Sequence, residues 1–184
     1  MIVRSDGWVE GVCRIDSPNF DARPPDSAIQ LIVVHNISLP PGHYGGGHIS
    51  RLFTNALDVS VDPYFGQLAG LRVSAHLLVE RDGGVTQFVS FRDRAWHAGV
   101  SLFEGRAACN DFSVGIEVEG TDFELFSDLQ YTALNSVIGA LLTAYPINAV
   151  RGHCDIAPDR KTDPGPFFDW GRLDVPSTVS LPPA

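Results

Sequence analysis

The stretch "AIQLIVVHN", residues 28–36, is the strongest indication of the fold in this sequence. Its apolar residues are mostly β-branched, and the run is short for a helix, so it is typical of a buried central strand. The run ends at His35, and the prolines and glycines of "ISLPPGHYGGG", residues 37–47, predict a loop after it. A buried central strand requires neighbouring strands at its edges and further elements over its faces.

Three more segments are predicted to form strands. "SAHLLVER" and "VTQFVSF", residues 74–81 and 85–91, flank an Asp-Gly-Gly turn at residues 82–84 and predict a hairpin. Within "DFSVGIEVEG", residues 111–120, apolar positions alternate with acidic or glycine positions. This alternation predicts a strand with one apolar face and one face that carries carboxylates. The apolar positions are Val114, Ile116 and Val118, and the positions between them are Gly115, Glu117 and Glu119.

The segment 127–145 has the clearest helical pattern. Ser127 and Gln130 have the spacing of a capping box, in which each side chain accepts a hydrogen bond from the other residue's backbone amide. Behind them, apolar residues recur every three to four positions and predict a stripe that faces the core, and Pro146 ends the helix.

Apolar residues at helical spacing between residues 49 and 57 predict a second helix, closed by the Asp-Pro pair at residues 62–63. Strands and helices therefore interleave along the chain. We expect an α/β fold of the mixed α+β kind, in which a central mixed β-sheet is flanked by helices.

At 184 residues the chain is long enough to bury its own core, and we expect a single domain. Residues 1–27, polar and rich in proline toward their end, are expected to form a lead-in segment that packs on the domain. Residues 28–174 are expected to form the domain itself, and residues 175–184 a loose tail.

Charge and cysteine content limit the partners. The formal net charge of -9 argues against nucleic acid and against anionic membranes. No apolar run approaches the roughly 18 residues that span a bilayer, and the first 20 residues lack the continuous apolar segment of a secretion signal. Cys13, Cys109 and Cys154 are odd in number and widely spread, unlike a disulfide framework. We expect reduced thiols, a cytoplasmic location and a monomer.

The stretch "GHCDIAPDRKTDPGPFFDW", residues 152–170, places His153, Lys161 and Asp163 on an irregular, proline-rich backbone. A rigid irregular loop makes sense if these side chains must converge on a metal ion. Zinc accepts imidazole nitrogen and carboxylate oxygen, and a catalytic zinc site uses three protein ligands. His153 and Asp163 would be two ligands, with His35 the third. The alternative is that these are ordinary hydrogen-bonded loop and core histidines.

Several motifs along the chain must be taken together, namely "VVHNISLPPG", "DPYF", "LRVSAHLLVERDG", "RAWHAGVS", "CNDFSVGIEVEG" and "GHCDIAPDRKTDPGPFFDW". With these motifs the chain resembles the cytoplasmic N-acetylmuramoyl-L-alanine amidases of the AmpD type, and more distantly the phage-lysozyme and peptidoglycan-recognition-protein amidases. The resemblance implies a zinc amidase fold over residues 28–174. It places one zinc ion on His35, His153 and Asp163, and catalytic roles on Glu117 and Lys161.

Hydrolysis of an amide needs an activated water, a stabilised oxyanion and a protonated leaving amine. A zinc ion would lower the pKa of a bound water to about 7 and polarise the scissile carbonyl. Glu117 would carry the proton, and Lys161 would stabilise the oxyanion, an effect commonly worth about 3 kcal/mol. The residues alone do not choose between Glu117 and Glu119, and the resemblance selects Glu117. The alternative for Lys161 is a solvated loop lysine.

The resemblance also implies the substrate, which is muramic acid joined through its lactyl group to L-alanine, with a preference for the 1,6-anhydro sugar of wall recycling. Its peptide carries carboxylates, so an acidic protein must supply local cations, for which Arg72 and Arg106 are candidates. Asn36 and the backbone around Ala98 are candidates for hydrogen bonds to the peptide. For each arginine the alternative is an ordinary surface ion pair.

The sequence thus predicts a zinc-dependent amidase that acts on small muropeptides in peptidoglycan recycling, with a consequence for β-lactamase induction that the resemblance alone suggests. One alternative is a module that binds peptidoglycan without cutting it. Another is an extracellular lytic amidase that acts on intact cell wall.

Overall fold

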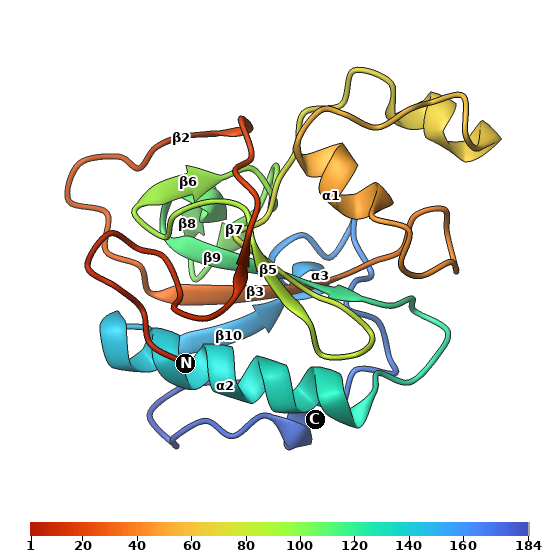
Figure 1. Ribbon diagram of the computed structural model, residues 1–184. Coiled ribbons are helices and arrows are strands. Elements are labelled where there is room, and N and C mark those ends of the chain that lie inside the picture. Colours follow the sequence, from red (N-terminus) through yellow and green to blue (C-terminus); the bar gives the residue numbers. More distant parts are fainter. Residues whose placement is uncertain (184) are drawn as a thin grey trace.

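The computed structural model describes residues 1–183 and is built around a six-stranded sheet of order β1-β5-β4-β9-β3-β10 (Figure 1). Most of the apolar stretch at residues 28–36 belongs to β3, which lies inside the sheet between β9 and β10. The strands are β1 (Cys13–Arg14), β3 (Leu31–Ile37), β4 (Leu77–Val79), β5 (Val85–Gln87), β9 (Ser113–Glu119) and β10 (Ala149–Gly152).

The sheet is mixed, as the sequence predicts. Strands β4, β9, β3 and β10 run parallel to one another, while β5 is antiparallel to β4 and completes the predicted hairpin. Strand β1 then adds to β5 in parallel. Two smaller antiparallel pairs lie outside this sheet, formed by β2 (Phe20–Ala22) with β6 (Asp93–Ala95) and by β7 (Leu102–Phe103) with β8 (Arg106–Ala107).

Helix α2 (Asp128–Ala144) runs along one face of the sheet (Figure 1). The predicted capping box is confirmed, because the Ser127 side chain accepts from the Gln130 amide and the Gln130 side chain accepts from the Ser127 amide. Between α2 and the sheet lies the largest hydrophobic cluster, in which each fully buried aliphatic side chain contributes roughly 1.5–3 kcal/mol. The sheet supplies Ile32, Val34, Val114, Ile116 and Val118 to this cluster, and the helix supplies Leu134, Val137, Ile138 and Leu141.

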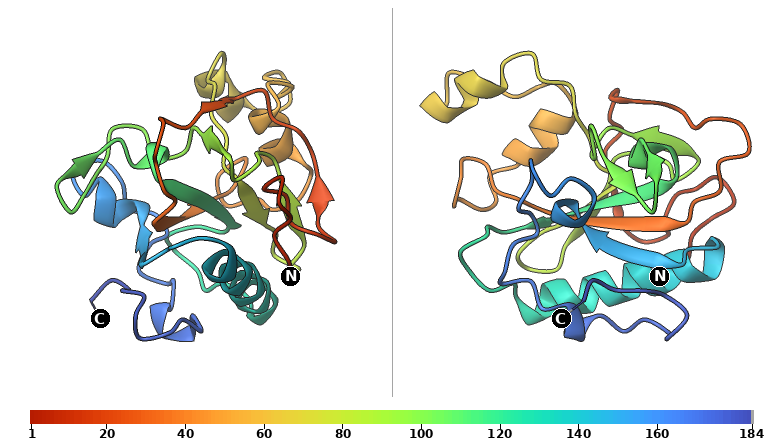
Figure 2. Two further views of the ribbon diagram at one scale, coloured as in Figure 1. Left: turned by 90° about the vertical axis from the view of Figure 1, so that its left-hand side faces the viewer. Right: turned by 180° about the vertical axis from the view of Figure 1, so that it is seen from behind.

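The alternation of β3 and β9 sends the other set of side chains to the opposite face. Leu31 and Val33 pack there in a smaller cluster, and His35 follows them on the same side of the strand. Helices α1 (His48–Phe53), α3 (His153–Ile156) and η2 (Cys109–Asp111) belong to this side of the molecule, away from α2 (Figure 2).

The predicted helix between residues 49 and 57 is shorter than expected. It ends at Phe53, and Asp62 does not close it. Asp62 instead begins the next element, because its side chain accepts from the Tyr64 amide at 2.8 Å and caps the 3-10 helix η1 (Pro63–Leu68). An Asp before a Pro fits a helix start as well as a helix end, which is why the sequence pattern misled here.

The lead-in segment contributes two strands, β1 and β2, to the sheets. Its Arg23 reaches into the domain, and burial lowers the pKa of this guanidinium to about 10. The guanidinium donates to the backbone carbonyls of Phe91, Asn110, Asp111 and Ser113. The expected boundaries of the lead-in and of the domain stay predictions.

The tail is attached over part of its length, which differs from the expectation that it is loose. Val179 is buried, and the Ser180 amide donates to the Asn148 carbonyl while the Ser180 carbonyl accepts from Val150, both at 2.9 Å. The short 3-10 helix η3 (Trp170–Arg172) precedes this segment. Across residues 1–183 no helix has both the length and the apolar character needed to cross a membrane.

Candidate active site

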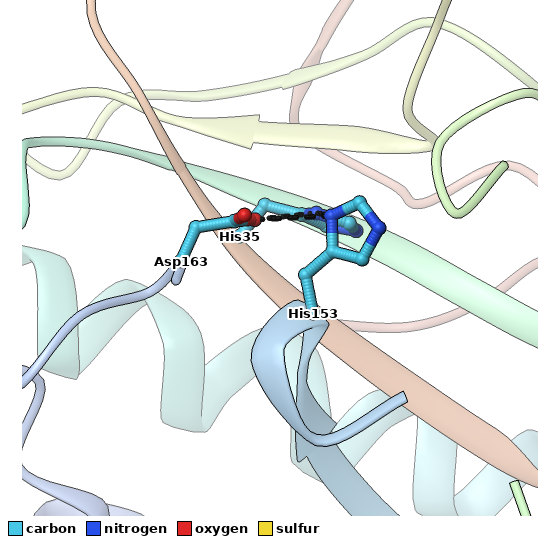
Figure 3. A group of neighbouring side chains, drawn as sticks. All are labelled: His35, His153 and Asp163. Carbon is cyan, nitrogen blue, oxygen red and sulfur yellow. Dashed lines mark hydrogen bonds and ion pairs between the residues drawn. The ribbon is translucent and has the colours of Figure 1, made fainter. Parts of the chain in front are cut away.

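Three side chains from distant parts of the chain meet on the face of the sheet opposite α2 (Figure 3). His35 lies near the end of β3, and the parallel register of β10 pairs Gly152 with Val34. His153, the next residue, is therefore delivered beside His35 as the first residue of α3. Asp163 joins them because the Cys154 amide donates to its carbonyl oxygen at 2.9 Å, which ties the end of the loop back to the start of α3.

The three groups present nearby donor atoms to one another. His35 Nδ1 lies 3.0 Å from His153 Nδ1 and 2.9 Å from Asp163 Oδ2, and His153 Nδ1 lies 3.2 Å from the same oxygen. The two imidazoles are buried, and the Asp163 side chain is 15% exposed. Two imidazole nitrogens and a carboxylate oxygen this close together match the donor set of a small divalent cation such as zinc.

The outer nitrogens of both imidazoles already have protein partners. His153 Nε2 lies 3.0 Å from the Ala98 carbonyl oxygen, and His35 Nε2 lies 3.0 Å from His97 Nδ1. A histidine that binds a metal through one nitrogen is usually held through the other in this way. His35, His153 and Asp163 therefore fit a metal ion, and they are the residues that would hold it.

Charge at this point is arranged to keep the carboxylate ionised. Burial by itself would raise the pKa of Asp163, but hydrogen bonds from His153 and His35 outweigh burial and lower the pKa below its usual range. Burial lowers the pKa of His35, with Asp163 acting in the opposite direction. An ionised carboxylate and a neutral imidazole are the forms that bind a metal.

Glu117 lies beside this group on the next strand. The register of β3 with β9 pairs Glu117 directly with His35, and both line a pocket of about 240 Å³ together with Trp96, His97 and Asp163. Within residues 1–183 the buried Oε2 atom of Glu117 has no hydrogen-bond partner. Burial raises the pKa of Glu117 well above its usual value, Asp163 raises it further, and Lys161 acts in the opposite direction. Glu117 is thus a half-buried residue that lines the pocket and whose buried Oε2 atom is an unused acceptor among the described residues.

Glu119, which the sequence left as an alternative to Glu117, is fully engaged elsewhere. Its Oε1 accepts from the Gly45 amide at 2.6 Å, and its Oε2 accepts from the Arg81 amide at 3.1 Å. The carboxylate is buried and anchors the glycine-rich loop that follows β3. Glu119 thus has a structural role, and the catalytic role of Glu117 stays a prediction.

Lys161 lines the same pocket as Glu117 and Asp163, and it also lines a second, more open pocket that adjoins the first. Its backbone amide donates to the Ala157 carbonyl at 3.0 Å, which holds the loop between α3 and Asp163 in a tight turn. The Lys161 side chain is thus a cation that this loop contributes to the lining of both pockets.

Comparison with known proteins identifies the family to which this chain belongs. The family model for N-acetylmuramoyl-L-alanine amidase matches residues 25–166. The chain belongs to the N-acetylmuramoyl-L-alanine amidase family. It is an amidase, and the predicted fold class is confirmed by solved relatives that share its architecture.

The relatives include proteins similar over nearly the whole chain. The 1,6-anhydro-N-acetylmuramyl-L-alanine amidase AmpD of Escherichia coli K12 is 56% identical over 171 residues, which cover 92% of this chain and 93% of the relative. A crystal structure of a selenomethionine AmpD derivative is 53% identical and superimposes with a TM-score of 0.92, covering 98% of this chain and 100% of the other.

A more distant solved relative carries a substrate. The structure of the amidase AmiD from Escherichia coli, in complex with anhydro-N-acetylmuramic acid-L-Ala-D-γ-Glu-L-Lys, is 29% identical to this chain. It superimposes with a TM-score of 0.58 and covers 82% of this chain and 59% of AmiD.

Four residues of the amidase were predicted to contact substrate. Asn36 lines the pocket, and its amide nitrogen donates to Asp122 and to the Pro164 carbonyl, which leaves its side-chain oxygen for a ligand. Arg72 is exposed and lines a neighbouring apolar pocket that shares Leu52 and Leu71 with the site.

The other two lie differently. The Ala98 amide donates to the Asn110 side chain, and the Ala98 carbonyl accepts from His153 and Arg160, so both backbone groups have partners within the protein. Arg106 lies on β8, outside the residues that line the pocket. Its guanidinium donates to Ser27 at 2.9 Å and covers the Phe112 ring at 4.0 Å. Substrate contact by all four residues stays a prediction.

The contact between His97 and His35 was not predicted from the sequence. The Nδ1 atom of His97 lies 3.0 Å from His35 Nε2. Burial lowers the pKa of His97 well below its usual value, and the neighbouring His35 and His76 rings lower it further. The sequence signal that could have indicated this contact is Gly115. A glycine inside a strand leaves space on that face of the sheet, and here the His97 ring fills the space.

Proposed function

We propose that this amidase hydrolyses the amide bond between 1,6-anhydro-N-acetylmuramic acid and L-alanine in muropeptides, and that it uses one zinc ion per chain. The observation that carries the proposal is the convergence of His35, His153 and Asp163 beside the unpartnered carboxyl oxygen of Glu117. The Escherichia coli relative bears the name of this activity, and the ligand in the AmiD complex contains the same anhydro sugar joined to L-alanine.

His35, His153 and Asp163 would hold the zinc ion, which when bound would supply Lewis acidity to activate water and polarise a carbonyl at neutral pH. Glu117 accepts a proton from the attacking water at its free Oε2 and delivers that proton to the leaving nitrogen. Burial raises its pKa above the usual carboxyl value, which is the direction that a proton carrier needs in order to work near neutral pH. Lys161, which lines the same pocket, would supply positive charge for the tetrahedral oxyanion.

Substrate contacts follow from the pocket and its neighbours. The Asn36 side-chain oxygen is placed to accept a hydrogen bond from the peptide, and Trp96 supplies an aromatic wall on the other side of the pocket. Arg72, in the neighbouring apolar pocket, is placed to pair with a stem-peptide carboxylate. We also propose peptide contacts for Arg106 and for the Ala98 backbone, where a ligand would have to displace the partners that both residues now have.

We assign the protein to peptidoglycan recycling in the cytoplasm, where it acts as a monomer on small muropeptides and thereby lowers the muropeptides that influence β-lactamase induction. The acidic surface, with a net charge of -9, supports a small diffusing substrate over an anionic polymer such as nucleic acid. The high identity to AmpD over both chains supports the same placement.

The test offers zinc-loaded protein two substrates in parallel, a soluble anhydro-muropeptide and intact sacculus, and measures release of the peptide by mass spectrometry. We expect release from the soluble substrate alone. Release from the sacculus as well would favour a lytic amidase. Tight binding without release from either substrate, with zinc bound, would favour a binding module.

A further inference from the structure

A further histidine, His97, contacts the imidazole of His35 on the side away from the candidate metal site. His97 Nδ1 lies 3.0 Å from His35 Nε2, and the two rings meet edge to face with centroids 5.1 Å apart. The other candidate ligand, His153, has a backbone carbonyl in this place. A carbonyl is always an acceptor, whereas a histidine nitrogen is an acceptor only in one tautomer. The tautomer of His97 therefore matters to His35.

The direction of the hydrogen bond follows from metal binding. If His35 Nδ1 binds the ion, a neutral His35 must carry its proton on Nε2, and that proton must be donated to an acceptor. The acceptor that the structure provides is His97 Nδ1. The proton of His97 then resides on its own Nε2, which lies 3.2 Å from the Ser113 hydroxyl oxygen, so this second bond is completed in the same direction.

We propose that His97 is a positioning residue for the metal site, which accepts the outer proton of His35 and thereby keeps His35 Nδ1 directed at the ion. This inference rests on the metal site of the proposed function.

The fold has made room for this ring. Gly115 lies on β9 opposite Val33, on the same face as Glu117. A Cβ atom at position 115 would lie 2.4 Å from Cγ of His97, which is well inside contact distance. Any side chain at position 115 would displace the His97 ring from His35. The contact between the two histidines therefore requires glycine at this position.

The backbone around His97 is held as well. The Asn110 side-chain oxygen accepts from the His97 amide at 3.2 Å and from the Ala98 amide at 2.8 Å. The same short segment thus carries the His97 ring to His35 and the Ala98 carbonyl to His153. One loop orients both imidazoles from outside the metal site.

The test measures zinc affinity by competition with a chromophoric chelator, and separately the unfolding of the metal-free protein. His97→Phe keeps an aromatic ring at this position, although a larger one, and removes the acceptor, so we expect zinc affinity to fall by about 10- to 100-fold. The matched control is His76→Phe, at a buried histidine whose ring packs 5.8 Å from His97 and whose polar contacts are with Gly115, Asp93 and Arg23 rather than a ligand. We expect this control to lower stability and leave zinc affinity unchanged.

A second variant separates an acceptor from mere packing. His97→Asn places an amide oxygen near the position of Nδ1, and we expect it to recover most of the affinity that His97→Phe loses. Equal affinity in wild type and His97→Phe would overturn the proposal, as would equal losses of affinity in His97→Phe and His76→Phe. If His97→Phe does not fold, the proposal is tested by His97→Asn alone, which must then bind zinc with near wild-type affinity.

Gly115→Ala gives an independent check. In the wild-type background we expect the added methyl to displace the His97 ring and to weaken zinc binding. In a His97→Ala background the methyl meets no ring, so it should weaken zinc binding no further. Additive effects would contradict the proposal. Wild-type protein that binds no zinc at all would instead refute the proposed function, which keeps the two failures distinct.

Discussion

Glu117 and Glu119 carry the same functional group two residues apart on β9, yet their surroundings give them different chemistry. Glu119 accepts two backbone hydrogen bonds and is buried, whereas the Oε2 atom of Glu117 has no partner among residues 1–183. A carboxylate without partners in a buried setting is costly for stability. Such a cost is typical of a residue that is retained for reactivity.

Replacement of this carboxyl by an amide should separate metal binding from turnover. Glu117→Gln keeps the shape of the side chain but no longer carries a proton, so we expect the turnover number to fall by about 100-fold or more. Zinc content, measured by atomic emission after dialysis, should remain that of the wild type. Glu119→Gln is the control, and its folded fraction should keep turnover near the wild-type value. Turnover near wild type in Glu117→Gln would remove Glu117 from the mechanism.

The raised pKa of Glu117 also predicts how stability varies with pH in the metal-free protein. Below its ordinary pKa the carboxyl is protonated in both states and has no effect. As the pH rises above that value, the unfolded chain releases the proton while the folded protein retains it, so the free energy of unfolding decreases. Glu117→Gln should therefore be more stable than wild type at pH 7 and equal to it at pH 4, as urea unfolding at both pH values would show. Parallel stability curves would be inconsistent with a raised pKa.

Asp163 is expected to be needed for the metal. Asp163→Ala leaves only the two imidazoles, and we expect zinc to be lost on dialysis because a catalytic zinc site relies on three protein ligands. Asp159→Ala, at an exposed aspartate of the same loop, should bind zinc as the wild type does. Full retention of zinc by Asp163→Ala would show that this carboxylate is not a ligand.

The three candidate metal ligands could be predicted from the sequence, but the residues that hydrogen-bond to their outer nitrogens could not. His35, His153 and Asp163 stand out because such side chains are unusual at a strand end and on a proline-rich loop. Their supporting partners are a backbone carbonyl and a histidine from another loop, Ala98 and His97. Nothing in the local pattern of "WHAG" indicates which side chain His97 contacts, because the contact joins this loop to a strand that is distant in the chain.

At the element scale, α2 offers a direct test of the capping box. Ser127 accepts from the Gln130 amide at 3.1 Å and donates to the Arg81 carbonyl at 2.8 Å. Ser127→Ala removes both bonds, and we expect the free energy of unfolding to fall by about 1 kcal/mol or somewhat more. Ser136→Ala, at an exposed position of the same helix, should change it by less than about 0.5 kcal/mol. Urea unfolding of the two variants makes the comparison.

Long elements with a clear period were predictable, and short ones were not. Residues 113–119 and 128–144 have alternating and helical patterns respectively, and both appear as β9 and α2. Strand β1 has only two residues, too few for any period, and its place at the edge of the sheet depends on pairing with β5. The helix boundary at Asp62 was wrong because the same residue type caps a start and marks an end.

At the scale of the whole molecule, the sequence predicted a mixed sheet but not the order of its strands. The order β1-β5-β4-β9-β3-β10 places β3 next to two strands that are far away in the chain. The register of β9 on β3 is what aligns Glu117 with His35. Register is fixed by packing of both faces across the sheet, which no single segment encodes.

A metal that binds residues from both ends of the domain should stabilise the whole fold. With free zinc at about 1,000 times the dissociation constant, we expect the free energy of unfolding to rise by roughly 4 kcal/mol. The measurement compares urea unfolding of zinc-loaded and chelator-treated protein. The increase should vanish in Asp163→Ala. An increase that persists in that variant would place the stabilising zinc elsewhere.

The positions of His35, His153 and Asp163 along the chain also affect biosynthesis. His153 and Asp163 are synthesised 118 and 128 residues after His35. A nascent chain therefore cannot bring the three side chains together before residue 163 has emerged from the ribosome. A product that ends before residue 163 lacks one of the three side chains and with it the candidate metal site.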